Sequence, residues 1–92
     1  MRNFIDTDGH QAWYLNGMRH REDGPAFVGA DGSQAWWLNG DLHRTDGPAI
    51  IWEDGVKRWY LNGLQTSFEE YVNQLFPEDS PERSLFLLKY SD

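Results

Sequence analysis

The residues best suited to chemistry in this 92-residue chain form two copies of the pattern His-Arg-x-Asp, which begin at His20 and His43. The motif residues are His20, Arg21, Asp23, His43, Arg44 and Asp46. A histidine and a carboxylate at this close spacing can bind a metal ion or share a proton. Two copies could supply four ligands, so a metal-dependent hydrolase is one hypothesis for this chain.

The same residues also have a structural interpretation, which we favour. Each motif runs on into Gly-Pro-Ala, where an aspartate can bond backbone N–H groups of a turn and a histidine or arginine can bond a neighbouring unit. The next copy has Thr66 at the histidine position and Glu69 at the aspartate position. We therefore expect turn residues rather than ligands at His20, Asp23, His43 and Asp46. The sequence predicts no metal, no cofactor and no enzymatic activity, since it also lacks a Gly-rich phosphate loop.

A strict sequence repeat must position these motifs. The pentapeptide WYLNG or WWLNG begins at Trp13, Trp36 and Trp59, at a constant interval, and the third copy departs from the pattern after Gly63. The apolar pair at 4–5 marks a half-unit ahead of the first full copy. The units span residues 8–30, 31–53 and 54–76. A constant period of this order predicts a stacked repeat array within a single domain over 1–92.

Each unit reads as a β-hairpin. Asn-Gly between apolar runs favours a type I′ turn, and it occurs at residues 16–17, 39–40 and 62–63. Asp-Gly at residues 8–9, 31–32 and 54–55 marks the second turn of each unit. We expect an antiparallel meander of about six or seven strands over residues 4–63. The fold class is therefore mainly β with a C-terminal α part.

Side-chain alternation along the strands sorts the aromatic residues into two ladders. The tryptophans that open the pentapeptides share one face with the leucines of the same pentapeptides, and this face is the better candidate for the core. The second ladder consists of Tyr14, Trp37 and Tyr60. These rings either bind a partner, a role that tyrosine and tryptophan often have, or lie under the C-terminal tail. The sequence leaves both alternatives open.

The tail, residues 64–92, predicts an acidic helical cap. Phe68, Tyr71, Val72, Leu75 and Phe76 recur with helical periodicity. Thr66 or Ser67 is the expected N-cap, with Glu69 or Glu70 completing a capping box, and Pro77 ends the helix. A second segment begins at Ser80 with Leu85, Phe86, Leu88 and Tyr90 as its apolar side chains. A helix is expected there, and a short strand at 85–88 is the alternative.

Composition limits the possible partners. The formal charge is −7 and the chain has no cysteine, which excludes disulfides and thiolate metal sites. An acidic surface disfavours direct contact with nucleic acid and favours a basic partner. The tail carries six acids and two bases. Its candidate partner-binding acids are Glu69, Glu70, Glu78, Asp79 and Glu82. With no membrane-spanning stretch and no signal peptide recognised, we expect a cytoplasmic location in a bacterial or infected host cell.

The pattern WYLNG–xxHRxDGPA–DG over residues 4–63 resembles bacterial and phage repeat proteins related to the MORN repeat, including YwqK-type antitoxins. MORN units have a similar length and also stack as β-hairpins. The resemblance implies a protein-binding scaffold without chemistry of its own, sometimes one side of a toxin–antitoxin or phage–host conflict. Trp13, Trp36 and Trp59 and the two HRxDGPA stretches depart from the usual tyrosine-glycine signature of MORN units.

Together these observations favour a non-enzymatic module that binds a protein partner stoichiometrically, as an inhibitor or antitoxin-like factor. One form is an anti-CRISPR-type or other anti-defence protein whose acidic surface occupies the nucleic-acid groove of a basic nuclease. A carbohydrate-binding module that uses the ladder of Tyr14, Trp37 and Tyr60 is the alternative. An open sheet edge at the N-terminal half-unit makes a homodimer possible.

Overall fold

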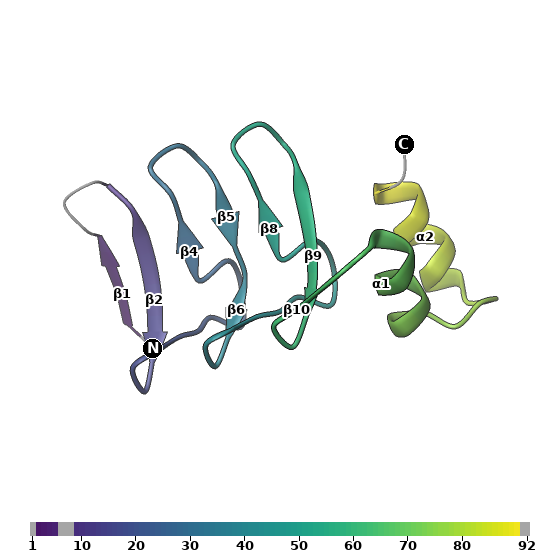
Figure 1. Cartoon of the computed structure of the whole chain (residues 1–92), viewed down its shortest axis with the longest axis horizontal. Helices are drawn as coiled ribbons and strands as arrows, with labels where there is room; N and C mark the ends of the chain where they lie inside the picture. Colours follow the sequence, from purple (N-terminus) through teal and green to yellow (C-terminus); the bar gives the residue numbers. More distant parts are fainter. Residues whose placement is uncertain (1, 6–8, 91–92) are drawn as a thin grey trace.

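Three β-hairpin units stand side by side, and two helices close the end of the row (Figure 1). The computed structural model describes residues 2–5, by their backbone alone, and residues 9–90. The strands are β1 (Arg2–Ile5), β2 (Gln11–Leu15), β3 (Met18–Arg19), β4 (Phe27–Val28), β5 (Gln34–Ala35), β6 (Trp37–Leu38), β7 (Asp41–Leu42), β8 (Ile50–Ile51), β9 (Lys57–Leu61) and β10 (Leu64–Thr66). The helices are α1 (Phe68–Leu75) and α2 (Pro81–Tyr90). The molecule measures 46 × 29 × 19 Å along its principal axes.

The expected antiparallel meander is confirmed. The main sheet runs in the order β1-β2-β4-β5-β8-β9-β10, with β3 paired to β2, and β1 supplies the predicted half-unit. The strands outnumber the six or seven expected mainly because each unit has a further short strand after its Asn-Gly turn, namely β3, β7 and β10. One more is added at Trp36, where the chain changes its pairing partner and β5 is divided from β6. The Trp36 N–H donates to the Ala49 carbonyl, and its own carbonyl accepts from the His43 N–H. Strands β6 and β7 therefore form a separate two-stranded sheet below this point.

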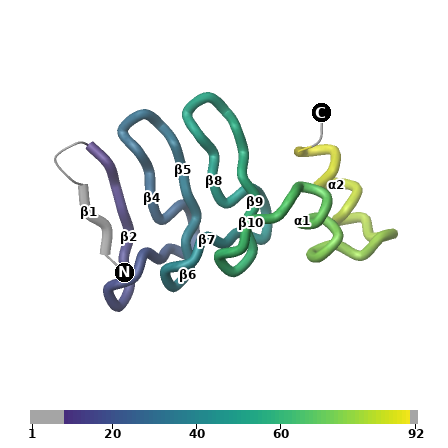
Figure 2. Tube along the Cα trace, viewed as in Figure 1, coloured from purple at the N-terminus to yellow at the C-terminus, as the bar shows by residue number. Residues whose placement is uncertain are grey.

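Asn-Gly turns close the lower end of each hairpin, visible as the tight bends in Figure 2. Asn16, Asn39 and Asn62 have φ values of 53°, 51° and 52°, and the glycines that follow are also positive. These values match the type I′ turn that Asn-Gly favours. The turns also join successive units, because the Gly40 N–H donates to the Arg19 carbonyl and the Gly63 N–H to the Leu42 carbonyl.

The hydrophobic core is concentrated between the third unit and the helices. Trp59 and Leu61 are buried there with Tyr71, Val72 and Phe86. The equivalent tryptophans of the first two units are only half-buried. The expectation that the Trp-plus-Leu face forms the core therefore holds fully for the third unit alone, since only that unit is covered by the helices.

Helix α1 begins and ends where the sequence predicts. Ser67 is its N-cap, with a capping box to Glu70, and Phe76 is its C-cap directly before Pro77. The second tail segment is a helix, and the Ser80 hydroxyl accepts from the Arg83 N–H at its start. The expected apolar face of α2 is wrong in part. Leu85 and Leu88 are 66% and 79% exposed, because Leu87 packs on the core in their place.

Candidate functional site

Each His-Arg-x-Asp loop is organised around its arginine. The Arg21 guanidinium lies 4.2 Å from the ring centroid of Trp13, and its Nε donates to Asp23 at 2.9 Å. Its Nη1 donates to the Pro25 carbonyl at 3.2 Å. In the second loop the corresponding residues are Trp36, Arg44, Asp46 and Pro48, at 3.8, 2.8 and 3.0 Å. The neighbouring guanidinium lowers the pKa of Asp23 below its usual value. The main partner of each aspartate is thus the arginine, rather than the turn N–H groups we expected.

The histidines of the two loops bridge neighbouring units. Nδ1 of His20 accepts from the Asn39 N–H at 2.9 Å, and Nδ1 of His43 accepts from the Asn62 N–H at 2.8 Å. An accepting Nδ1 requires that a neutral ring carry its proton on Nε2, which in His20 faces Glu22 at 3.3 Å. Each histidine therefore ties its own unit to the Asn-Gly turn of the next one.

The motif residues do not converge on a metal ion. Among the residues that the structure describes, no group of three or more histidine, aspartate or glutamate side chains is placed to hold one. The histidines bond backbone N–H groups and the aspartates bond arginines, so each motif residue already has a structural contact. Within the described residues, the motif side chains therefore do not form the cluster of ligands that the hydrolase hypothesis needs.

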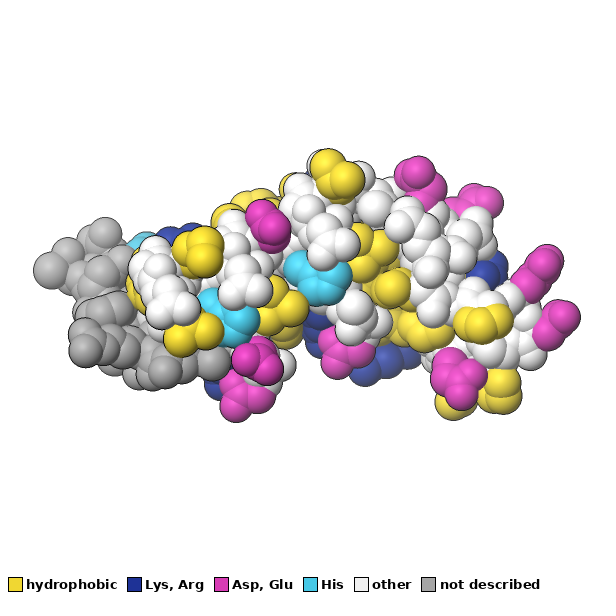
Figure 3. Space-filling view, turned by 90° about the horizontal axis from the view of Figure 1, so that it is seen from below, with side chains coloured by type: hydrophobic (Ala, Val, Ile, Leu, Met, Phe, Trp, Pro, Cys, Tyr) yellow, Lys and Arg dark blue, Asp and Glu magenta, His cyan; other side chains and the backbone are white. Residues whose placement is uncertain are grey.

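A groove of about 470 Å³ separates the first loop from the second. Residues 21–24 form one wall, while Trp36, Leu38 and residues 43–46 form the other. Figure 3 shows this side of the molecule, with the histidines in cyan spaced along the array. Glu22 and the two motif aspartates lie exposed at the rim. The groove therefore combines an indole, carboxylates and open backbone.

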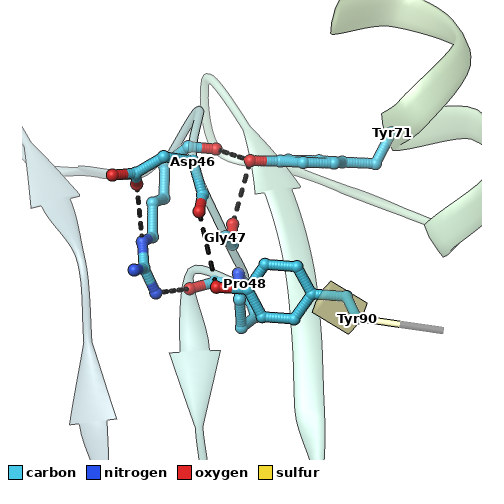
Figure 4. A network of polar contacts seen from close by, with 6 residues as sticks. Asp46, Gly47, Pro48, Tyr71 and Tyr90 are labelled. Atoms are coloured by element: carbon cyan, nitrogen blue, oxygen red, sulfur yellow. Dashed lines mark hydrogen bonds and ion pairs between the residues drawn. The ribbon is translucent and has the colours of Figure 1, made fainter. Parts of the chain in front are cut away.

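The second loop, in contrast, is covered by the helices (Figure 4). The Tyr71 hydroxyl donates to the Gly47 carbonyl at 2.9 Å and also contacts the Arg44 carbonyl. The Tyr90 hydroxyl lies 3.4 Å from the Asp46 carbonyl. Burial raises the pKa of Tyr71 to about 12, because the phenolate would lose its hydration. Two tyrosines thus fasten the cap to one loop backbone.

The face that carries Tyr14, Trp37 and Tyr60 is not covered by the helices, which pack around Trp59 instead. All three ladder rings are half-buried. The Arg19 guanidinium lies among the rings on this face. Its central carbon is 5.9 Å from the Tyr14 ring centroid, 4.9 Å from that of Phe27 and 5.4 Å from that of Trp37.

A mainly apolar pocket of about 170 Å³ opens beside Arg19. Phe27, Trp37, Ile50 and Trp52 contribute to its lining, and Trp52 is 47% exposed. The Trp37 Nε1 is buried and has no hydrogen-bond partner within the described part of the chain. No described residue accepts a hydrogen bond from the Arg19 guanidinium either. A buried donor without an acceptor is uncommon in folded proteins and calls for an explanation.

The five predicted tail acids are all exposed (Glu69, Glu70, Glu78, Asp79 and Glu82). Magenta acidic side chains accordingly stand out around the helical end in Figure 3. Glu70 has a structural part as well, because its carboxylate accepts from the Ser67 N–H in the capping box. The structure does not bring the tail acids and the aromatic ladder together into one site.

Sequence reasoning missed Arg19, Phe27 and Trp52 as members of the aromatic face. A signal for Arg19 was present in the repeat itself. The equivalent positions in the second and third units are Leu42 and Gln65, so the arginine departs from the repeat. A residue that breaks a structural repeat is a candidate for function, because the fold does not require it there.

Comparisons with known proteins do not assign the chain to a family. No protein-family model, curated protein or solved structure matches the chain. In the described residues, neither helix has the length and apolar character needed to cross a membrane.

Proposed function

We propose that this chain is a non-enzymatic module that binds a protein partner stoichiometrically through its aromatic face, Tyr14, Arg19, Phe27, Trp37, Trp52 and Tyr60. The observation that carries the proposal is the buried Trp37 indole N–H, which has no acceptor among the described residues and lies with Arg19 beside an open apolar pocket. Aromatic rings with an arginine are the typical composition of protein-binding hot spots.

The chemistry of the face defines what the partner presents. The buried Trp37 N–H requires an acceptor and the Arg19 guanidinium attracts one, so a partner carboxylate or carbonyl group fits beside them while an apolar side chain enters the pocket. The resemblance to MORN-type repeats supports a scaffold role. The charge of −7 supports a partner with a basic surface. An inhibitor or antitoxin-like factor, including an anti-defence protein directed at a basic nuclease, has these properties.

The test is affinity capture of partners from a bacterial lysate, with Arg19→Leu as the central variant. Leucine occupies the equivalent position in the second unit, at Leu42, so the repeat itself tolerates it. We expect the captured protein to be lost or weakened at least tenfold by Arg19→Leu. The triple variant Tyr14→Ala/Trp37→Ala/Tyr60→Ala should lose the captured protein altogether, provided that circular dichroism shows the variant to be folded.

Matched controls separate this face from the tail. Leu88→Ala changes an exposed residue of α2 and should bind as the unaltered chain does. A variant with Glu78→Gln, Asp79→Asn and Glu82→Gln tests the tail acids. Loss of the partner only in the tail variant would move the interface to the tail. Added nucleic acid should compete with the partner if the partner's nucleic-acid groove is the surface engaged.

A carbohydrate-binding module is the second candidate, and the exposure of Trp52 beside the pocket favours it. Sugar rings stack on exposed indoles, and the Trp37 N–H and the Arg19 guanidinium could donate to their hydroxyl groups. Glycan titration followed by tryptophan fluorescence tests this candidate. A saturable change that Arg19→Leu abolishes, without any captured protein, would replace the protein-binding proposal.

A further inference from the structure

The open groove lies one repeat unit before the space that the helical cap fills, and the walls of the two spaces are formed by equivalent residues. Moving one unit along the chain turns its wall at 21–24 into residues 44–47, and its Trp36 into Trp59. In that later position the space is occupied by rings of the cap, with Tyr71 at 4.8 Å and Tyr90 at 5.3 Å from Trp59. The molecule therefore contains a filled version of its own open groove.

The contacts of Tyr71 with the second loop show which backbone groups accept hydrogen bonds in the filled space. The Tyr71 hydroxyl is bonded to the carbonyls of Arg44 and Gly47. The equivalent carbonyls, those of Arg21 and Gly24, accept no hydrogen bond from any described residue. Arg21 and Gly24 both line the groove, and their loop has the same arginine-centred contacts as the second loop, so these carbonyls correspond to the pair that Tyr71 bonds.

Trp36 and Trp59 differ in burial, because the cap covers only Trp59. Trp59 is buried against four aromatic rings of the cap, whereas Trp36 is half-buried and has Arg44 stacked on it. The stacked side chains of Trp36 and Arg44 therefore form the floor of the groove, and the space above them is open. Its rim carries Glu22, whose side chain is 77% exposed and which contacts only His20 among the described residues.

We propose that this groove is a docking site for a tyrosine side chain on a helical segment of the protein partner. The phenol hydroxyl donates to the carbonyls of Arg21 and Gly24, and the ring lies against Trp36 and Arg44. Glu22 at the rim selects a lysine or arginine next to that tyrosine. This inference rests on the proposed function and adds a second contact, on another surface than the aromatic face.

The test uses small molecules that stand in for the tyrosine, with the isotope-labelled full chain observed by NMR. Tyramine carries a phenol and a cation, and phenethylamine differs from it only in lacking the hydroxyl. We expect tyramine to shift the amides of residues 21–24 and 43–46 and the Trp36 indole with a dissociation constant in the millimolar range. Phenethylamine should bind about five- to tenfold more weakly, the effect of one hydrogen bond.

Variants confirm the location. Thr45→Trp places a bulky ring at an exposed position of the groove wall and should abolish the shifts. Gln74→Trp adds the same ring on α1, away from the groove, and should leave them unchanged. Glu22→Gln should weaken both amines equally, by about twofold, because it removes only the carboxylate charge.

Equal binding of the two amines, or shifts that persist in Thr45→Trp, would overturn the tyrosine site. That outcome leaves the proposed function untouched, because partner capture and its dependence on Arg19 are measured separately. Conversely, tyramine binding in the groove without any captured partner would count against the protein-binding proposal and not against the groove's preference for phenols.

Discussion

Residues 20–26 and 43–49 have almost the same sequence and the same local fold, yet the helices cover only the second of these two loops. In both loops an arginine stacks on a tryptophan and bonds an aspartate and a proline carbonyl. What differs is the neighbour: the helical cap lies on the second loop, and the open groove lies beside the first. Local conformation is therefore set within each loop, whereas burial is set by what packs against it.

The largest effect should come from removing the ring that covers the second loop. Tyr71 is fully buried and contacts both the loop carbonyls and Trp59. We expect Tyr71→Ala to lower the free energy of unfolding by about 3–5 kcal/mol, as for other buried aromatic truncations. Urea denaturation measures this, with Leu88→Ala as the exposed control at under about 0.5 kcal/mol. A loss near that of the control would show that the cap does not hold the second loop.

Equivalent glycines of the two loops should respond unequally. A Cβ at Gly47 would lie 2.6 Å from the Arg44 guanidinium carbon and 2.7 Å from the Tyr90 hydroxyl. At Gly24 it would meet only the Arg21 side chain, at 2.9 Å, with no ring of the cap beside it. We expect Gly47→Ala to cost about 1–3 kcal/mol through overpacking, and Gly24→Ala less than about 1 kcal/mol. Thermal unfolding of both variants checks this, and equal costs would contradict the difference between the loops.

The hydroxyl alone should have a smaller, pH-dependent effect. Tyr71→Phe leaves two loop carbonyls without their donor, which we expect to cost about 1–2 kcal/mol near neutral pH. The folded-state pKa of Tyr71, about 12, exceeds the ordinary value of 10.0. The unfolded chain therefore loses this proton first, so stability should fall as the pH rises from 10 to 12. Urea denaturation across that range should show a shallower decline in Tyr71→Phe, and an unchanged decline would exclude Tyr71 as its source.

The smallest effects should be those shared by both loops. His20→Ala and His43→Ala each remove the acceptor of one inter-unit hydrogen bond. We expect each to cost about 1 kcal/mol, because an asparagine N–H loses its partner in both cases. Guanidinium denaturation of the two variants checks this. A much larger cost at His43 would mean that the cap also depends on that junction.

Most of the fold could be predicted from the sequence because its signals are local. Asn-Gly favours the type I′ turn, whose two central residues need positive φ values, and a repeat of fixed length imposes the same hairpin three times. The capping box is likewise readable in the short stretch from Ser67 to Glu70. The strand count was harder, because the strands that follow the Asn-Gly turns (β3, β7 and β10) have only two or three residues and carry no apolar alternation of their own.

The candidate sites could be predicted only in part, since they depend on how distant segments pack. The ladder of Tyr14, Trp37 and Tyr60 follows from alternation, but whether the tail covers it does not. The tail packs on Trp59, so Leu85 and Leu88 of α2 stay exposed although their spacing resembles a buried face. The open groove has no sequence signal of its own, because it is defined by the absence of a cap at the first loop.

The junctions between units allow the array to grow. The Gly40 N–H bonds the Arg19 carbonyl, and one unit later the Gly63 N–H bonds the Leu42 carbonyl. Among the residues that the structure describes, the hydroxyls of the cap tyrosines bond to the last full loop alone. An in-frame duplication of residues 31–53 would therefore insert a unit whose two sides already match their neighbours. The length of the molecule, and with it the number of grooves along its side, is thus a quantity that gene duplication can change in whole steps while both ends stay as they are.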